Sequence, residues 1–168
     1  MKSLRKNLAK HVLHSGADEL DFSLIGISCA DDQYRVTTLV NDSLGTALFL
    51  SDYVPLNLKS GRLFTFSLYR YSDDELGLDY YLVPNASNFE GPGAAVAKEG
   101  DLFSGQELDE RTLLIKELPK TDYFFMLKGE SQQHFLHDVC DRLRRSGAFT
   151  RVEVIDPLSL PSRKNLVF

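Results

Sequence analysis

The sequence has few cysteines and no long apolar run. Its two cysteines, Cys29 and Cys140, lie far apart and form no C-x-x-C pair, so neither a disulfide framework nor a zinc ribbon is indicated. No segment approaches the ~20 consecutive apolar residues of a membrane-spanning helix, and no continuous apolar region marks a secretory signal. These absences predict a soluble protein of the cytoplasm.

The sequence also lacks an excess of basic residues. Its formal net charge of −5 disfavours non-specific binding of nucleic acids. Residues 1–16 carry +4, and the whole chain carries −5, so the remainder carries −9. Leu4, Leu8 and Val12 recur every four residues in this basic segment, as in an amphipathic helix. We expect residues 1–15 to be a loosely held basic terminus. A presequence or a membrane-surface anchor is the alternative.

The length and the apolar content predict a single domain over residues 1–168. A hydrophobic content of 43% is sufficient for a sizeable core. Residues 86–110 lose all periodicity and are rich in glycine and acids, which predicts a long loop or an insertion.

Hydrophobic periodicity and turn residues divide the rest of the chain into helices and strands. Asp31 or Asp32 is expected to cap the first helix and Gly45 to end it, while Ser131 and Gly147 bracket the second. The expected elements are strands at 21–29, 62–71, 76–85, 122–130 and 149–155, another strand near Leu48, helices at 33–44 and 131–146, and an extended tail at 156–168.

This order predicts an α+β fold, with a mainly antiparallel sheet and two helices packed on one face. The segments 22–28 and 123–127 are apolar on both faces, so they are expected to be neighbouring central strands. The helices should pack on their common face through Val36, Val40, Val139 and Leu143.

The stretch "IKELPKTDYFF" places polar residues around a proline, just before an apolar run. Pro119 biases Leu118 toward an extended conformation, so the stretch is expected to bend and to direct a strand into the core. Asp122, at the start of that strand, can accept hydrogen bonds from nearby backbone N–H groups.

The same stretch resembles the signature of the IPExxxVDY family, small proteins of the Bacteroidetes. The matching residues are Ile115, Glu117, Thr121, Asp122 and Tyr123, with Lys116 in place of the proline and Thr121 in place of the valine. "DFSLIGIS", "LDYYLVPN", "DYFFMLKG" and "IDP" are also similar to that family, whereas residues 86–110 fit it less well. The resemblance implies a cytoplasmic bacterial protein without an assigned function, and it supplies no catalytic residues. We interpret the signature as a structural one.

The second predicted helix carries His134, His137, Asp138 and Asp141 on one face. Histidines at i and i+3 with carboxylates can bind zinc. The same residues, with Arg142 and Arg145, can instead form a ladder of i,i+4 pairs in solvent, which we prefer. Cys29 could be a nucleophile at a helix N-terminus, but Asp31 and Asp32 oppose a thiolate, so a buried, inert thiol is predicted.

Two surfaces remain as candidates for binding. The first is formed by the hairpin tyrosines Tyr69, Tyr71, Tyr80 and Tyr81, and the second by the arginines Arg142, Arg144, Arg145 and Arg151. We found no enzyme motif, and we predict no catalytic, cofactor or metal residues. The sequence therefore predicts a non-catalytic protein-interaction module whose partner is another protein or a second copy. The alternative is an RNA-associated protein that uses the arginine patch and the tyrosines.

Overall fold

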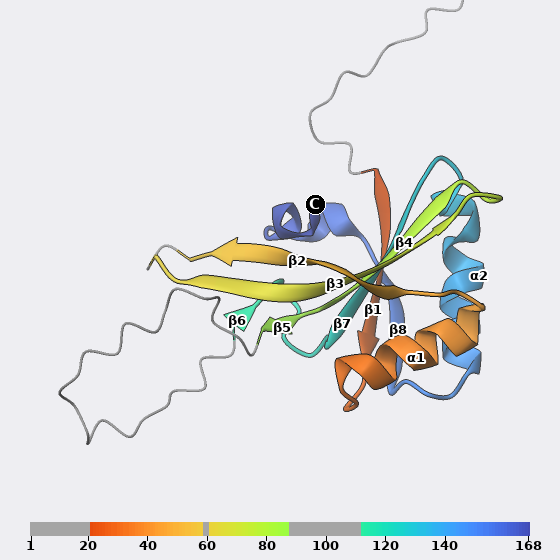
Figure 1. Cartoon of the computed structure of the whole chain (residues 1–168), viewed down its shortest axis with the longest axis horizontal. Coiled ribbons are helices and arrows are strands. Elements are labelled where there is room, and N and C mark those ends of the chain that lie inside the picture. Colours follow the sequence, from red (N-terminus) through yellow and green to blue (C-terminus); the bar gives the residue numbers. More distant parts are fainter. Residues whose placement is uncertain (1–20, 59–60, 88–111) are drawn as a thin grey trace, which may run out of the picture.

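A six-stranded antiparallel sheet forms the centre of the molecule, with the strand order β2-β3-β4-β7-β1-β8. The computed structural model describes residues 21–58, 61–87 and 112–168. Two helices lie on one side of the sheet (Figure 1), which confirms the predicted α+β class. The elements in chain order are β1 (Phe22–Ser28), α1 (Gln33–Leu44), β2 (Phe49–Asn57), β3 (Leu63–Asp73), β4 (Leu78–Pro84), β5 (Ala86–Ser87), β6 (Thr112–Leu113), β7 (Tyr123–Lys128), α2 (Gln132–Arg145), β8 (Arg151–Ile155) and the 3₁₀ turns η1 (Pro157–Ser159) and η2 (Arg163–Leu166).

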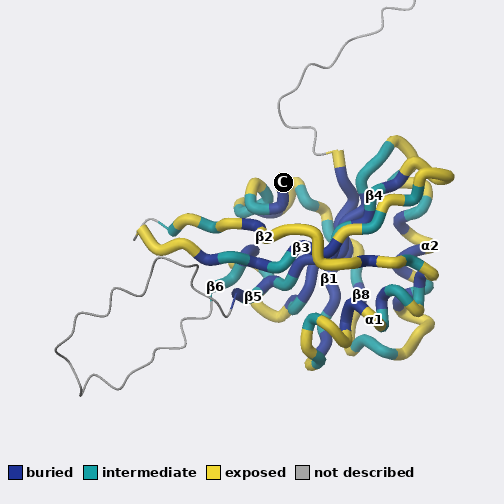
Figure 2. Tube along the Cα trace, viewed as in Figure 1, coloured by how far each residue is buried: buried dark blue, intermediate teal, exposed yellow. Residues whose placement is uncertain are grey.

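The two most apolar strands, β1 and β7, are neighbours within the sheet, as predicted. They pair antiparallel with Ile25 opposite Phe125, while β8 and β4 pair with their outer sides. Because side chains alternate along a strand, both strands direct apolar groups to both faces of the sheet. Burial is correspondingly concentrated at the centre of the sheet (Figure 2).

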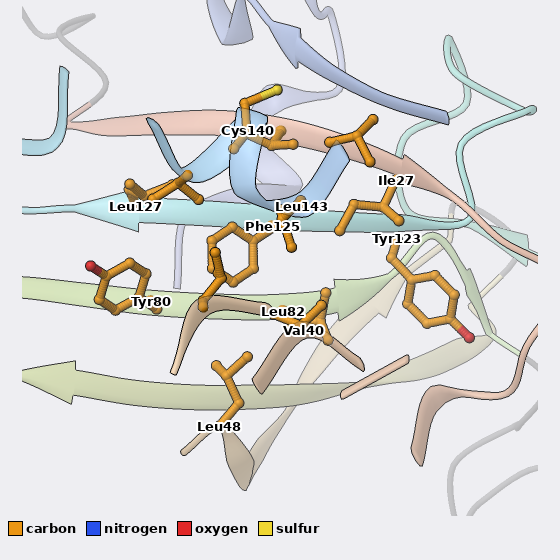
Figure 3. Packing of buried hydrophobic residues seen from close by; sticks show 14 of the residues in the cluster. Ile27, Val40, Leu48, Tyr80, Leu82, Tyr123, Phe125, Leu127, Cys140 and Leu143 are labelled. Carbon is orange, nitrogen blue, oxygen red and sulfur yellow. The ribbon is translucent and has the colours of Figure 1, made fainter. Parts of the chain in front are cut away.

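The first core lies between the sheet and the helices. Val36 and Val40 of α1 and Val139 and Leu143 of α2 pack with sheet residues such as Phe125, as predicted. Figure 3 shows Val40, Leu143 and Phe125 among the buried side chains of this core.

The helix ends agree with the predictions except at one position. Asp32 caps α1, since its Oδ1 accepts the backbone N–H groups of Tyr34 and Arg35, each at 3.0 Å. Gly45 follows α1 with φ 67°, and Gly147 follows α2 with φ 66°. Ser131 precedes α2, but its side chain makes no capping hydrogen bond.

The opposite face of the sheet carries a second core around Phe64, Phe66 and Phe124. Residues 114–118 and the segment 157–168 contribute to this core, although neither contains an α-helix or a strand. The prediction of an extended tail at 156–168 was wrong, because Asp156 caps a 3₁₀ turn there. Its Oδ1 accepts the backbone N–H of Leu158 at 2.9 Å, and a second 3₁₀ turn follows.

The structure also bears on the predicted hairpin, on the strand near Leu48 and on the loop 86–110. The predicted hairpin is present as β3 and β4, and the strand expected near Leu48 is β2. Residues 86 and 87 form β5, which pairs with β6, so the predicted loop 86–110 begins with a short strand. The other residues of that range, and the predicted terminus 1–15, lie outside the described residues. Within the described ranges, the helices are too short and too polar to cross a bilayer.

Candidate functional site

The signature stretch is organised by a buried asparagine that the sequence analysis did not single out. Asn85 Nδ2 donates to the carbonyl oxygens of Leu118 and Thr121, both at 2.9 Å. Its Oδ1 accepts the backbone N–H of Ile115 at 2.8 Å. Asn85 is fully buried, so these bonds satisfy backbone groups that would otherwise be desolvated without partners. In the sequence, Asn85 is marked by its position directly after the strand-ending Pro84, at the end of "LDYYLVPN".

The side chains of the signature point to different parts of the molecule. Ile115 belongs to the second core, whereas Tyr123 belongs to the first. Asp122 Oδ2 accepts the backbone N–H of Cys29 at 2.9 Å. Glu117 is exposed, and its Oε1 accepts the N–H and the hydroxyl of Ser162 at 3.1 and 2.9 Å. These contacts join separate chain segments, which supports the structural interpretation of the signature.

Thr121 fills the space above a glycine in a central strand. A Cβ atom built on Gly26 would lie 3.1 Å from Thr121 Cγ2 and 2.6 Å from Ile155 Cδ1. The two branched side chains therefore occupy the position that a residue with a side chain would need at Gly26.

A pocket of about 700 Å³ lies next to the signature, between the start of α1 and the helix-side face of the sheet. Tyr123 and Cys29 line it. The Tyr123 hydroxyl donates to the carbonyl oxygen of Asp31 at 2.8 Å, and the Cys29 thiol donates to a carboxylate oxygen of the same residue at 3.2 Å. These two bonds fix the wall of the pocket.

Both groups keep their protons at neutral pH. Burial raises the pKa of the Tyr123 phenol to about 12, and the neighbouring Cys29 and Asp122 add to this rise. Burial also raises the pKa of the Cys29 thiol. Cys29 is buried, as predicted. A protonated thiol is a poor nucleophile, so these groups act as hydrogen-bond donors.

The charge of the pocket has one sign. Asp31, Asp32 and Asp122 line it, and none of the described residues in its wall is basic. Arg35 Nε forms an ion pair with Asp31 Oδ1 at 3.2 Å, and both side chains are exposed. The described surroundings therefore favour a cation over an anion.

The four hairpin tyrosines do not form one exposed patch, which corrects the prediction. Tyr69 and Tyr80 are 4% and 5% exposed and belong to the first core. Tyr71 lies directly opposite Tyr80, and their ring centroids are 6.0 Å apart. Tyr81 lies on the other face, packed against the second core. The alternation of the strand directs these rings to opposite faces, and packed elements cover both faces.

A different aromatic surface is exposed at the sheet edge. Tyr34 of α1 is 71% exposed, and Tyr53 and Leu50 of β2 are 55% and 39% exposed. Leu50 lies opposite Tyr69 in the β2–β3 pair, and Tyr53 lies opposite Ser67. We call these three exposed residues the α1/β2 surface.

The buried Tyr69 lies next to this surface, opposite Leu50 in the β2–β3 pair. Burial raises the pKa of the Tyr69 phenol, and the nearby Tyr34 and Tyr53 phenols add to the rise. The surface also adjoins the pocket, because Ser67, the partner of Tyr53, lines it. The α1/β2 surface could not be predicted from the sequence, because a bulge between Leu50 and Asp52 interrupts the alternation of β2.

The arginine patch is largely engaged in local bonds. Arg144 donates to the carbonyl oxygen of Val152 at 2.9 Å and pairs with Asp141 at 3.2 Å. Arg151 pairs with Glu153 at 2.6 Å. The i,i+4 ion pairs predicted for Asp141 of α2 do not form. Its carboxylate pairs with Arg144 at i+3, and Arg145 donates to its carbonyl oxygen instead.

The histidines of α2 do not gather into a metal site. His134 packs edge-on against Phe135, with 5.2 Å between the ring centroids. Within residues 21–58, 61–87 and 112–168, no group of three or more His, Cys, Asp or Glu side chains is arranged to hold a metal ion.

Comparison with protein-family models, with curated proteins and with solved structures finds no match to this chain.

Proposed function

We propose that this protein is a non-catalytic protein-interaction module and that the α1/β2 surface is its contact site. The observation that carries the proposal is the exposure of Tyr34, Leu50 and Tyr53, with the Tyr34 and Tyr53 phenols both near the Tyr69 phenol. Tyrosines are rigid and amphipathic, so they bury a large contact area while ordering few torsions. This site replaces the hairpin tyrosines, of which Tyr69 and Tyr80 are already buried.

The charge around this surface indicates the chemistry of the partner. The adjoining pocket presents Asp31, Asp32 and Asp122 and no basic residue among those described, and the chain has a net charge of −5. A protein segment with lysine or arginine beside apolar residues is complementary to both features. We therefore propose a basic segment of another protein as the occupant.

The outer edge of β2, which pairs with no strand among the described residues, is a less suitable contact. An unpaired edge can add a strand from another chain. In β2, however, the bulge between Leu50 and Asp52 interrupts the register, and Pro55 has no N–H to donate. We therefore propose that the partner contacts the side chains of the α1/β2 surface rather than the edge backbone.

RNA association is the alternative. Arg142 and Arg145 are its best remaining candidates, because Arg144 and Arg151 are paired with acids. Both helices, however, direct their C-terminal ends toward a shallow groove that Arg142 and Arg145 line. The negative ends of the helix dipoles disfavour a phosphate there. Replacing Arg142 and Arg145 with glutamine should leave the binding described below unchanged.

A displayed library of random 12-residue peptides, selected on the full chain, tests the proposal. We expect enrichment of peptides that combine basic with apolar residues. The enrichment should disappear with Tyr34→Ser/Tyr53→Ser. The matched control is Leu76→Ser/Val154→Ser, which alters exposed apolar residues outside α1 and β2. Enrichment that survives in the tyrosine variant, or enrichment of acidic peptides, would reject the proposed site.

The cellular setting is also a proposal. Both cysteines are free, which favours a reducing compartment such as the cytoplasm. Membership of the IPExxxVDY family stays a prediction that depends on Ile115, Glu117 and residues 121–123.

A further inference from the structure

Residues 157–168, which we call the strap, lie on the second core with few buried side chains. Leu160 and Leu166 are buried there, while Leu158 and Val167 remain exposed. The Phe168 ring meets the Tyr81 ring edge-on, with 5.9 Å between the centroids. In Figure 1 the strap lies away from α1 and α2.

Three hydrogen bonds join the strap to the segment 114–117. Ser162 donates its N–H and its hydroxyl to Glu117 Oε1. Asn165 Nδ2 donates to the carbonyl oxygen of Leu114 at 2.8 Å. Because Glu117 is exposed, water can replace its bonds at little cost.

Five backbone N–H groups of the strap are satisfied locally. N–H groups donate to carbonyl oxygens three residues earlier, at Ser159, Leu160, Arg163, Asn165 and Val167. The strap contributes no strand to either sheet. Detaching it therefore leaves the ladders of the central sheet intact, unlike the removal of any strand. A unit with few buried contacts and local hydrogen bonds opens before the core does.

We propose that the strap detaches as a unit and that the same segment of a second copy of this chain can occupy its place. The site that the strap covers accepts two leucines six residues apart. It also offers Glu117 and the Leu114 carbonyl oxygen as hydrogen-bond acceptors. A second copy carries this pattern by identity of sequence. Exchange of an identical element between protomers gives a closed two-fold dimer. This inference does not depend on the α1/β2 surface.

Amide hydrogen exchange of the full chain tests the detachment. Ser162→Ala/Asn165→Ala removes two bonds of the strap and leaves Glu117 and Leu114 in place. We expect it to accelerate exchange across residues 158–167 by one common factor, on the order of tenfold, without changing β1 or β7. Ser159→Ala is the matched control, because that hydroxyl donates locally, to the carbonyl oxygen of Asp156 just before the strap. Acceleration limited to the two altered residues, or equal acceleration in β1 and β7, overturns the detachment.

A peptide of residues 156–168 tests the occupancy. A labelled peptide should bind the Ser162→Ala/Asn165→Ala chain about tenfold more tightly than the wild-type chain, because the vacant site is more populated. The same peptide with Leu160→Ser and Leu166→Ser should not bind. Equal binding of both peptides, or no binding, overturns the proposal.

The second copy is tested by capture of the wild-type chain. An immobilised copy should retain an untagged copy in proportion to its concentration. The peptide of residues 156–168 should release it, and the serine-substituted peptide should not. Failure of capture, or capture that the peptide does not reverse, contradicts exchange of the strap.

Discussion

Asn85 Oδ1 accepts the backbone N–H of Ile115 at 2.8 Å and so fixes Ile115 against the second core. The two residues are thirty positions apart in the chain, and both are fully buried. Through this contact the end of β4 fixes the segment that covers the second core, and with it the entry into β7.

Asn85→Ala should be strongly destabilising. It leaves the Ile115 N–H and the Leu118 and Thr121 carbonyl oxygens without their side-chain partner in a buried environment. We expect a loss of roughly 2–4 kcal/mol in the free energy of unfolding, measured by urea denaturation. Asn57→Ala, at an exposed position of β2, is the control and should change it by less than ~0.5 kcal/mol. Similar values for both variants would show that Asn85 does not organise the segment.

Two acids of the signature should differ in their effect. Asp122→Ala should cost about 1–2 kcal/mol, since its partly buried carboxylate accepts the Cys29 N–H. Glu117→Ala should cost less than about 1 kcal/mol, because Glu117 is exposed. Thermal melting of the two variants measures the difference. A larger loss for Glu117 than for Asp122 would contradict the assignment.

Stability at alkaline pH should depend on Tyr123. Its pKa is about 12 in the folded chain and about 10 in an unfolded one. The unfolded state therefore releases the proton first, so this contribution is complete below pH ~10 and is lost as the pH rises toward 12. Urea denaturation from pH 8 to 12 should show a steeper fall for the wild-type chain than for Tyr123→Phe. Parallel profiles would show that the phenol does not contribute.

The pattern of apolar residues was sufficient to predict the strands and helices at the centre of the fold. Unbroken apolar runs identified β1 and β7, and periodicity and capping residues located α1 and α2. The exposure of the tyrosines could not be predicted, because alternation shows that Tyr69 and Tyr81 face opposite sides but not that both sides are covered. The strap looked extended because prolines suppressed its periodicity. The role of Asn85 depends on contacts at thirty or more residues' separation, which local patterns do not show.

Gly26 should tolerate alanine only with adjustment of its neighbour. The added Cβ would lie 2.6 Å from Ile155 Cδ1, so we expect a loss of about 1–3 kcal/mol. Ile155→Val removes that methyl group, and the double variant should recover part of the loss. A double-mutant cycle from urea denaturation measures the coupling. Strict additivity would mean that the two side chains do not compete for this space.

Calorimetric titration of the best-enriched basic peptide into the full chain tests the proposed interaction most directly. We expect Tyr34→Ser/Tyr53→Ser to weaken binding at least about tenfold, with thermal stability nearly unchanged. Leu76→Ser/Val154→Ser should leave the affinity as in the wild-type chain. Higher salt should weaken binding of the peptide to the wild-type chain and to this control variant. Equal affinity of the tyrosine variant and the control variant would contradict the assignment of the α1/β2 surface as the protein-binding site.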